Sequence, residues 1–311
     1  VSDASNASRT QLMALDGAGW DAELCALFGV PMGALPQIVD NAGMFGATLP
    51  DLLGGAIPIC GLAGDQQAAT IGQGRLAPGE AKATLGTGAF ILTPMGEVLP
   101  QSAHRLLGTV LCQTDGRRSY ALEGSIFVAG SLIQWLRDRL GLIEAAEDSD
   151  AIARSVPDNG GVYMLPALSG LGAPYWRPEA TGTITGLTHG TGRAHIVRAA
   201  LESMAHQVQD LGRAFAADGA PWTRLRIDGG MSANDWIAQD LADILGLTVE
   251  RPADVETTAR GAAMLAGVGA GLFSDLAAAG AMASALVRFE PAMEPARRVE
   301  RLSGWHKLIE G

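Results

Sequence analysis

The strongest constraint on the fold is the order in which strand-like and helix-like segments follow one another between residues 82 and 272. The first three segments have the residue pattern and flanking turns of antiparallel strands, and they are 82–92, 106–113 and 119–122. Helix and strand patterns then alternate, with helices at 127–140, 191–217, 232–245 and 257–272 and strands at 161–165, 225–227 and 247–250. This order predicts an α/β domain in which helices cover a central sheet.

Other parts of the chain support more local expectations. Residues 57–63 predict a buried apolar strand that enters a glycine turn at Gly64, and we expect it to lack sheet partners. Ser232 and Asp235 fit a capping box at the start of their helix. The alanine-rich segment 277–285 predicts a further helix.

The composition limits the classes of partner. A formal net charge of −11 at pH 7 argues against nucleic acid and anionic membranes, because both are bound through basic patches. The cysteines are widely spaced, the histidines form no metal motif, and no apolar run reaches membrane-spanning length. We therefore expect a cytoplasmic protein with no metal ligands of its own. Homo-oligomerisation stays open.

Asp65 is the first candidate for chemistry. It follows an apolar segment and a glycine turn, and residues 66–72 after it predict a helix. One interpretation is a helix cap, a position in which Asp is common. The other is a carboxylate at the end of a strand, placed to accept a proton from an alcohol that attacks a phosphate. The two interpretations are compatible.

Two further glycine turns are candidates for phosphate binding. Gly86-Thr87-Gly88 is either a plain hairpin turn or a loop that brings backbone and the Thr87 hydroxyl against phosphates. Asp228-Gly229-Gly230 lies between a strand and a helix start, where the helix end favours anions, although a plain turn explains it equally well. Gly130 and Gln134 lie four residues apart on one helix face, so they either touch one ligand or pack.

Together these motifs have the order and spacing of the FGGY carbohydrate kinases, which the chain resembles. A longer signature of that family is also present, at Gly182, Ile184, Gly186, Leu187, His195, Ile196, Ala199, Ala200, Leu201 and Glu202. Within the family the chain is most similar to the glycerol kinases, in the segments 5–10, 64–69, 122–124, 133–138 and 170–176. The resemblance extends from residue 1 to about residue 305.

The resemblance implies an actin-like (ribonuclease H-like) ATPase fold. Residues 1–74 would be the end of the amino-terminal lobe, including the catalytic aspartate, and residues 75–311 the carboxy-terminal nucleotide-binding lobe. Asp65 would be the catalytic base, Gln66 would also contact glycerol, and Phe90 would pack on the carbon face of the polyol. The residues implied to hold ATP or ADP are Thr87, Gly130, Gln134, Gly230 and Asn234. Mg²⁺ would neutralise the phosphates of ATP.

The chain departs from the family pattern in two places. The family's amino-terminal phosphate loop, its Arg-Glu pair and its aromatic glycerol contacts are not among these 311 residues. Because the chain also begins at Val1, we interpret it as a fragment and expect it to be inactive alone. Ala56 stands where some bacterial members carry an arginine that binds fructose 1,6-bisphosphate, so we do not expect inhibition by that compound.

The resemblance therefore implies an ATP-dependent kinase that converts glycerol to glycerol 3-phosphate. A first alternative is a kinase for another polyol or a ketose, such as erythritol or xylulose. A second alternative, of another class, is an actin-like module that binds nucleotide without catalysis. Asp65 argues against the second alternative, because a pure nucleotide clamp needs no base at that position.

Overall fold

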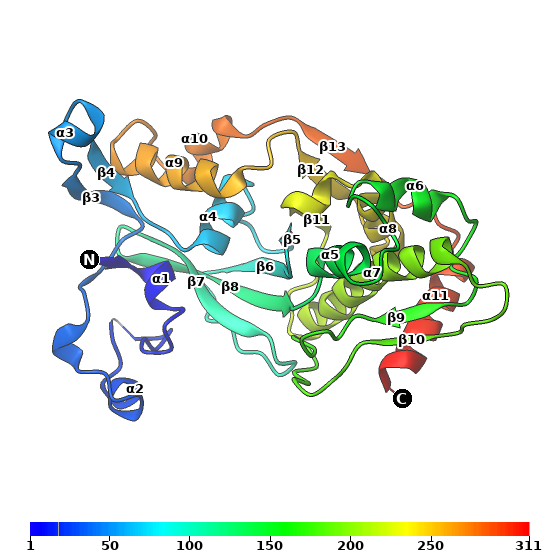
Figure 1. Ribbon diagram of the computed structural model, residues 1–311. Coiled ribbons are helices and arrows are strands. Elements are labelled where there is room, and N and C mark those ends of the chain that lie inside the picture. Colours follow the sequence, from blue (N-terminus) through cyan, green and yellow to red (C-terminus); the bar gives the residue numbers. More distant parts are fainter. Residues whose placement is uncertain (18, 311) are drawn as a thin grey trace.

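Figure 1 shows the computed structural model of the chain, which describes residues 1–17 and 19–310. Its centre is a seven-stranded sheet in the order β13-β12-β11-β5-β6-β8-β7. These strands are β5 (Glu80–Leu85), β6 (Ala89–Gly96), β7 (Leu107–Thr114), β8 (Arg117–Ile126), β11 (Arg224–Asp228), β12 (Val249–Pro252) and β13 (Leu286–Phe289). Strand β11 pairs in parallel with β5 and β12, and the other pairs are antiparallel. The predicted α/β architecture with a central sheet is confirmed.

Three helices cover one face of this sheet: α5 (Gly130–Asp138), α7 (Arg193–Ala217) and α8 (Asp235–Leu245). The apolar stripe predicted on α7 is buried at Ala200, Met204, Val208, Leu211 and Phe215. It packs with alternate residues of the strands in the largest hydrophobic cluster of the protein. The 3.6-residue period of the helix and the two-residue period of the strands thus meet in one core.

Two helices cross closely over the other face: α4 (Asp65–Gly72) and α9 (Thr257–Gly269). Their contact depends on glycine. A Cβ atom on Gly72 would lie 2.0 Å from the Thr257 carbonyl oxygen, and one on Gly261 would lie 1.8 Å from the Ala68 carbonyl oxygen. Only a residue without a side chain allows two backbones to approach this closely.

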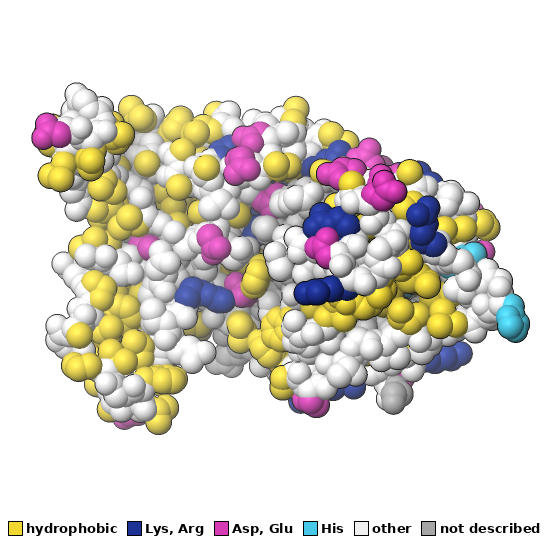
Figure 2. Space-filling model, in the orientation of Figure 1, with side chains coloured by type: hydrophobic (Ala, Val, Ile, Leu, Met, Phe, Trp, Pro, Cys, Tyr) yellow, Lys and Arg dark blue, Asp and Glu magenta, His cyan; other side chains and the backbone are white. Residues whose placement is uncertain are grey.

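The segment before α4 consists of short elements: β1 (Ser2–Asp3), α1 (Ala4–Ala7), α2 (Ala22–Leu27), β2 (Ile38–Val39), β3 (Ala42–Ala47), α3 (Pro50–Leu53) and β4 (Pro58–Gly61). The strand expected at 57–63 forms β4, but two details of that prediction are wrong. Strand β4 pairs antiparallel with β3, and Ile57 and Ile59 are 48% and 41% exposed. Helix α9 packs beside this hairpin, and hydrophobic side chains gather on the surface over α3, β3 and β4 (Figures 1 and 2).

The remaining elements are α6 (Asp148–Arg154), β9 (Tyr163–Leu165), β10 (Thr183–Thr185), α10 (Leu276–Ala279), α11 (Pro295–Glu310) and 3₁₀ turns at Met32–Ala34, Gly230–Ala233 and Gly280–Met282. The helix predicted over 277–285 is wrong in extent, because α10 ends at Ala279. The predicted capping box is also wrong: Asn234 caps α8, and the Ser232 hydroxyl donates to the Gly229 carbonyl instead. None of the helices in the described parts of the chain combines the length and hydrophobicity needed to span a bilayer.

Candidate active site

Asp65 is the first residue of α4, and its side chain is exposed. The N-cap position belongs to Gly64, so Asp65 is not the cap residue that one interpretation expected. Its Oδ1 accepts a hydrogen bond of 2.7 Å from the backbone N–H of Gln66. A carboxylate in the first turn is favoured by the positive end of the helix dipole. Its Oδ2 accepts only a long hydrogen bond of 3.5 Å from Gln66 Nε2, and because the side chain is exposed, this oxygen can accept a proton from a molecule in solvent.

A buried polar cluster holds the loop that leads to Asp65. The backbone N–H of Gly64 donates to the Ser5 hydroxyl at 2.9 Å. The Asn41 amide donates to Ser5 Oγ at 3.1 Å, to Asp3 Oδ1 at 2.8 Å and to the Leu62 carbonyl at 2.8 Å. Asp3, Ser5 and Asn41 are all buried, so these bonds are shielded from water and fix the loop. The sequence analysis did not select these residues.

The glycine turns meet at one edge of the sheet. Strands β5, β8 and β11 run in the same direction, so their carboxyl ends lie at the same edge, where α/β proteins commonly bind ligands. The Gly130 N–H donates to the Gly86 carbonyl at 2.9 Å. A Cβ on Gly130 would lie 2.5 Å from that oxygen, and one on Gly229 would lie 2.7 Å from the Leu85 carbonyl oxygen. Gly229 has a φ of +82°, which also favours glycine.

The predicted nucleotide residues lie near this edge of the sheet. They differ in how exposed they are and in whether their side chains already form hydrogen bonds. Thr87 and Gly230 are exposed, and a Cβ on Gly230 would meet open space. Gln134 is exposed one turn along α5 from Gly130, which is buried. Asn234 is half-buried, and its side chain is already engaged: Oδ1 accepts from the Ile237 N–H at 3.1 Å and Nδ2 donates to Ser149 at 3.2 Å. These assignments stay predictions.

Phe90 lies on the sheet face that α4 covers. It pairs with Thr84 across β5 and β6, two residues from the pair formed by Lys82 and Leu92, so all four side chains share one face. Lys82 on this face donates from Nζ to Gln66 Oε1 at 2.6 Å. Phe90 is 37% exposed, which is unusual for a large apolar side chain on a covered sheet face. The three predicted substrate residues thus belong to one side of the sheet.

Comparison with known proteins shows the family of the chain. The chain matches the model of the FGGY family of carbohydrate kinases, C-terminal domain, over residues 81–270, and that of the N-terminal domain over residues 1–72. The chain belongs to the FGGY family of carbohydrate kinases. The matched ranges lie on either side of the boundary predicted near residue 74, which stays a prediction.

Curated relatives of this FGGY chain include glycerol kinases. The glycerol kinase of Rhodospirillum centenum is 51% identical over 309 residues, which are 99% of this chain and 62% of the relative. The glycerol kinase of Coxiella burnetii is 50% identical over 310 residues, again 62% of its own length. The chain thus spans about three fifths of the length of these relatives.

Solved structures confirm the predicted actin-like α/β fold of the family. A Plasmodium falciparum glycerol kinase crystallised with ADP superposes with a TM-score of 0.91 at 36% identity, and the match covers 99% of this chain and 62% of that one. A xylulose kinase from Rhodospirillum rubrum superposes with a TM-score of 0.83 at 26% identity, over 100% and 64% of the two chains.

The side chains that could bind a metal ion are His, Cys, Asp and Glu. Within residues 1–17 and 19–310, no group of three or more His, Cys, Asp or Glu side chains is arranged to hold a metal ion. Mg²⁺ commonly binds proteins through one or two carboxylates together with substrate phosphates.

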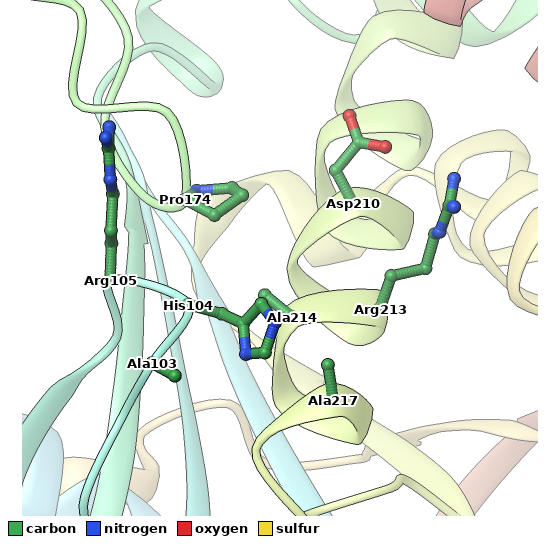
Figure 3. A pocket seen from close by; sticks show the side chains of 8 residues that line it. All are labelled: Ala103, His104, Arg105, Pro174, Asp210, Arg213, Ala214 and Ala217. Carbon is green, nitrogen blue, oxygen red and sulfur yellow. The ribbon is translucent and has the colours of Figure 1, made fainter.

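A separate cavity of about 420 Å³ lies away from the predicted site residues (Figure 3). Its lining is Ala103, His104, Arg105, Pro174, Asp210, Arg213, Ala214 and Ala217. Two of its basic groups are already engaged. His104 Nδ1 lies 2.7 Å from Asp218 Oδ1, and Arg105 donates to the Tyr175 carbonyl at 2.8 Å. No predicted substrate or nucleotide residue lines this cavity, so it is not the candidate site.

Proposed function

We propose that this chain is part of an ATP-dependent kinase that converts glycerol to glycerol 3-phosphate and ADP. The observation that carries the proposal is the exposed Asp65 carboxylate at the start of α4, held by a buried polar cluster in a chain about 50% identical to glycerol kinases. Activity would be measured on a full-length form, meaning this chain extended to the length of the relatives, of which it covers 62%.

Each predicted residue has a distinct task in this reaction. Asp65 accepts the proton of a glycerol hydroxyl while the hydroxyl oxygen attacks the γ-phosphorus of ATP, and ADP leaves with the electrons of the broken P–O bond. Gln66 orients the alcohol, and the Phe90 ring packs on its carbon atoms. Thr87, Gly130, Gln134, Gly230 and Asn234 bind the nucleotide at the strand ends. Mg²⁺ bound to the ATP phosphates would supply positive charge that offsets theirs.

The two alternatives differ in what supports them. A ketose such as xylulose is the substrate in the names of more distant structural relatives, but these are 26% identical or less, whereas the glycerol kinases above are about 50% identical. Erythritol has no support among these relatives. A non-catalytic nucleotide module would have no use for an exposed, supported carboxylate at Asp65.

An ADP-release assay tests the proposed function. In the full-length form, ADP release should require both ATP and glycerol and should saturate with glycerol. ADP release that does not depend on any alcohol, or that occurs with xylulose and not with glycerol, would overturn the proposal.

Phe90→Ala should raise the KM for glycerol far more than the KM for ATP. The ring is proposed to contact only the alcohol, and loss of this apolar contact should cost about 1–3 kcal/mol, or roughly 5- to 150-fold in KM. Steady-state kinetics with each substrate varied in turn measures the effect. Phe28→Ala removes an aromatic that is 53% exposed at the end of α2 and is the matched control. Equal effects of Phe90→Ala on both KM values would mean that the ring supports the fold instead.

A further inference from the structure

Lys82 is the most unusual charged residue in the protein. It lies in β5, and none of its surface is exposed to solvent. The chain has 22 basic residues, and only Lys82 and Lys307 are lysines. Burial of an ammonium group is costly unless the group is paired and hydrogen-bonded. Such a residue therefore needs an explanation beyond packing.

The polar contact of Lys82 points at the candidate active site. Among the described residues, the ammonium has one hydrogen bond, in which Nζ donates to Gln66 Oε1 at 2.6 Å. Gln66 directly follows Asp65, and its Nε2 lies 3.5 Å from Asp65 Oδ2. A lysine ammonium can only donate, so the atom of the amide that faces it must be oxygen. The amide nitrogen of Gln66 must then face the Asp65 side.

We propose that Lys82 is a positioning residue of the phosphoryl-transfer site: it fixes the orientation of the Gln66 amide, so that its NH₂ group faces the alcohol beside Asp65. The proposal rests on the proposed function, because it assigns Gln66 to substrate. An NH₂ group in this place donates to an alcohol oxygen while Asp65 accepts the alcohol proton. Without Lys82 the amide can rotate by 180° and present its oxygen instead, which competes with Asp65 for that proton.

The charges around Lys82 are consistent with this task. The carboxylates that favour its charged form are Asp228 on β11, Glu123 on β8 and Asp65 on α4. None of them forms an ion pair with Lys82 among the described residues, and Asp228 Oδ1 and Glu123 Oε2 are buried without a hydrogen-bond partner. The Arg226 side chain, which pairs with Lys82 in register, is directed to Glu250. The ammonium is therefore available to donate a hydrogen bond to the Gln66 amide.

Burial lowers the pKa of Lys82 to about 8, and the three carboxylates only partly oppose this shift. The ammonium is thus present at pH 7 and is lost as the pH rises through about 8. A neutral amine is a weaker donor, so the hold on the Gln66 amide weakens over the same range. The kcat/KM for glycerol in the full-length form should therefore fall above about pH 8.

Lys82→Met tests the proposal, because methionine has a similar length without charge or donor. Loss of the ammonium leaves the buried carboxylates of Asp228 and Glu123 less compensated, so the melting temperature should fall, and the kinetics are measured at a temperature at which the variant is folded. The kcat/KM for glycerol should fall about 10- to 100-fold, as for a misplaced substrate contact. The control Lys307→Met changes an exposed lysine on α11 and should leave kcat/KM unchanged.

A double-mutant cycle separates positioning from a structural role. If Lys82 acts through Gln66, then Lys82→Met should have little further effect in a Gln66→Met background. The alkaline fall in kcat/KM near pH 8 should also be absent from Gln66→Met alone, a result that does not require Lys82→Met to fold. Additive effects in the cycle, or an alkaline limb unchanged in Gln66→Met, would overturn the proposal. Wild-type protein inactive with every alcohol would instead overturn the proposed function and the Lys82 role with it.

Discussion

Asp65→Asn in the full-length form is expected to lower kcat for glycerol phosphorylation by about 100- to 10,000-fold, the usual contribution of a general base. Asparagine has the same size, and its side-chain oxygen can still accept the 2.7 Å hydrogen bond from the Gln66 N–H. What it loses is the ability to take up the alcohol proton. The KM for ATP should stay nearly unchanged, since none of the predicted nucleotide residues lies in α4.

Steady-state kinetics on two variants makes this measurement specific. Asp51→Asn is the matched control, because Asp51 is also an exposed aspartate in the first turn of a helix, α3. It should leave kcat unchanged. Turnover of Asp65→Asn within about tenfold of the parent would remove Asp65 from the role of base.

Gly261→Ala is expected to have the largest effect on folding. The added Cβ would lie 1.8 Å from the Ala68 carbonyl oxygen and 2.9 Å from the Gly72 backbone nitrogen, so α4 and α9 must separate. Overpacking of this kind typically costs about 1–3 kcal/mol, and a clash with backbone belongs at the upper end or beyond. Because α4 begins at Asp65, the same displacement should also lower kcat.

Thermal unfolding of the 311-residue chain measures the loss of stability in Gly261→Ala. Steady-state kinetics of the full-length form measures the loss of kcat. Ala263→Ser is the control, because it adds one atom at an exposed position of the same helix. It should leave the melting temperature nearly unchanged. If Gly261→Ala had the same melting temperature as the parent, α4 and α9 would have to be further apart than in the structure.

Two kinds of feature could be predicted from the sequence: elements with a clear hydrophobic periodicity, and turns whose backbone requires glycine. Helix α7 was predicted because its apolar residues recur at helical spacing over more than five turns, from Ile196 to Phe215. The glycine turns were predicted from their short glycine runs, and Gly88 and Gly229 stand where the backbone approaches other backbone closely. Apart from β4, which was predicted as the strand 57–63, most of the short elements before α4 have too few residues for a period to be recognised.

Properties set by distant parts of the chain could not be predicted. A lysine between Ala81 and Ala83 in a strand is expected to face solvent, and its burial follows only from α4 lying over that face. Asn234 was predicted to bind nucleotide, but its role as the N-cap of α8 was not predicted. That role arises because the 3₁₀ turn before the helix ends at Ala233. The hydrogen bond from the Gly64 N–H to the Ser5 hydroxyl joins residues that are 59 positions apart, so no local pattern in the sequence indicates it.

The most direct test of the central claim is identification of the phosphorylated product by ³¹P NMR. The full-length form would be incubated with Mg²⁺, limiting ATP and equal concentrations of glycerol, erythritol and xylulose. The account predicts one main phosphomonoester signal, that of glycerol 3-phosphate, with stoichiometric ADP, and predicts that Asp65→Asn abolishes it under the same conditions. A main signal from xylulose or erythritol phosphate would contradict the substrate assignment, and release of inorganic phosphate alone would contradict transfer to an alcohol.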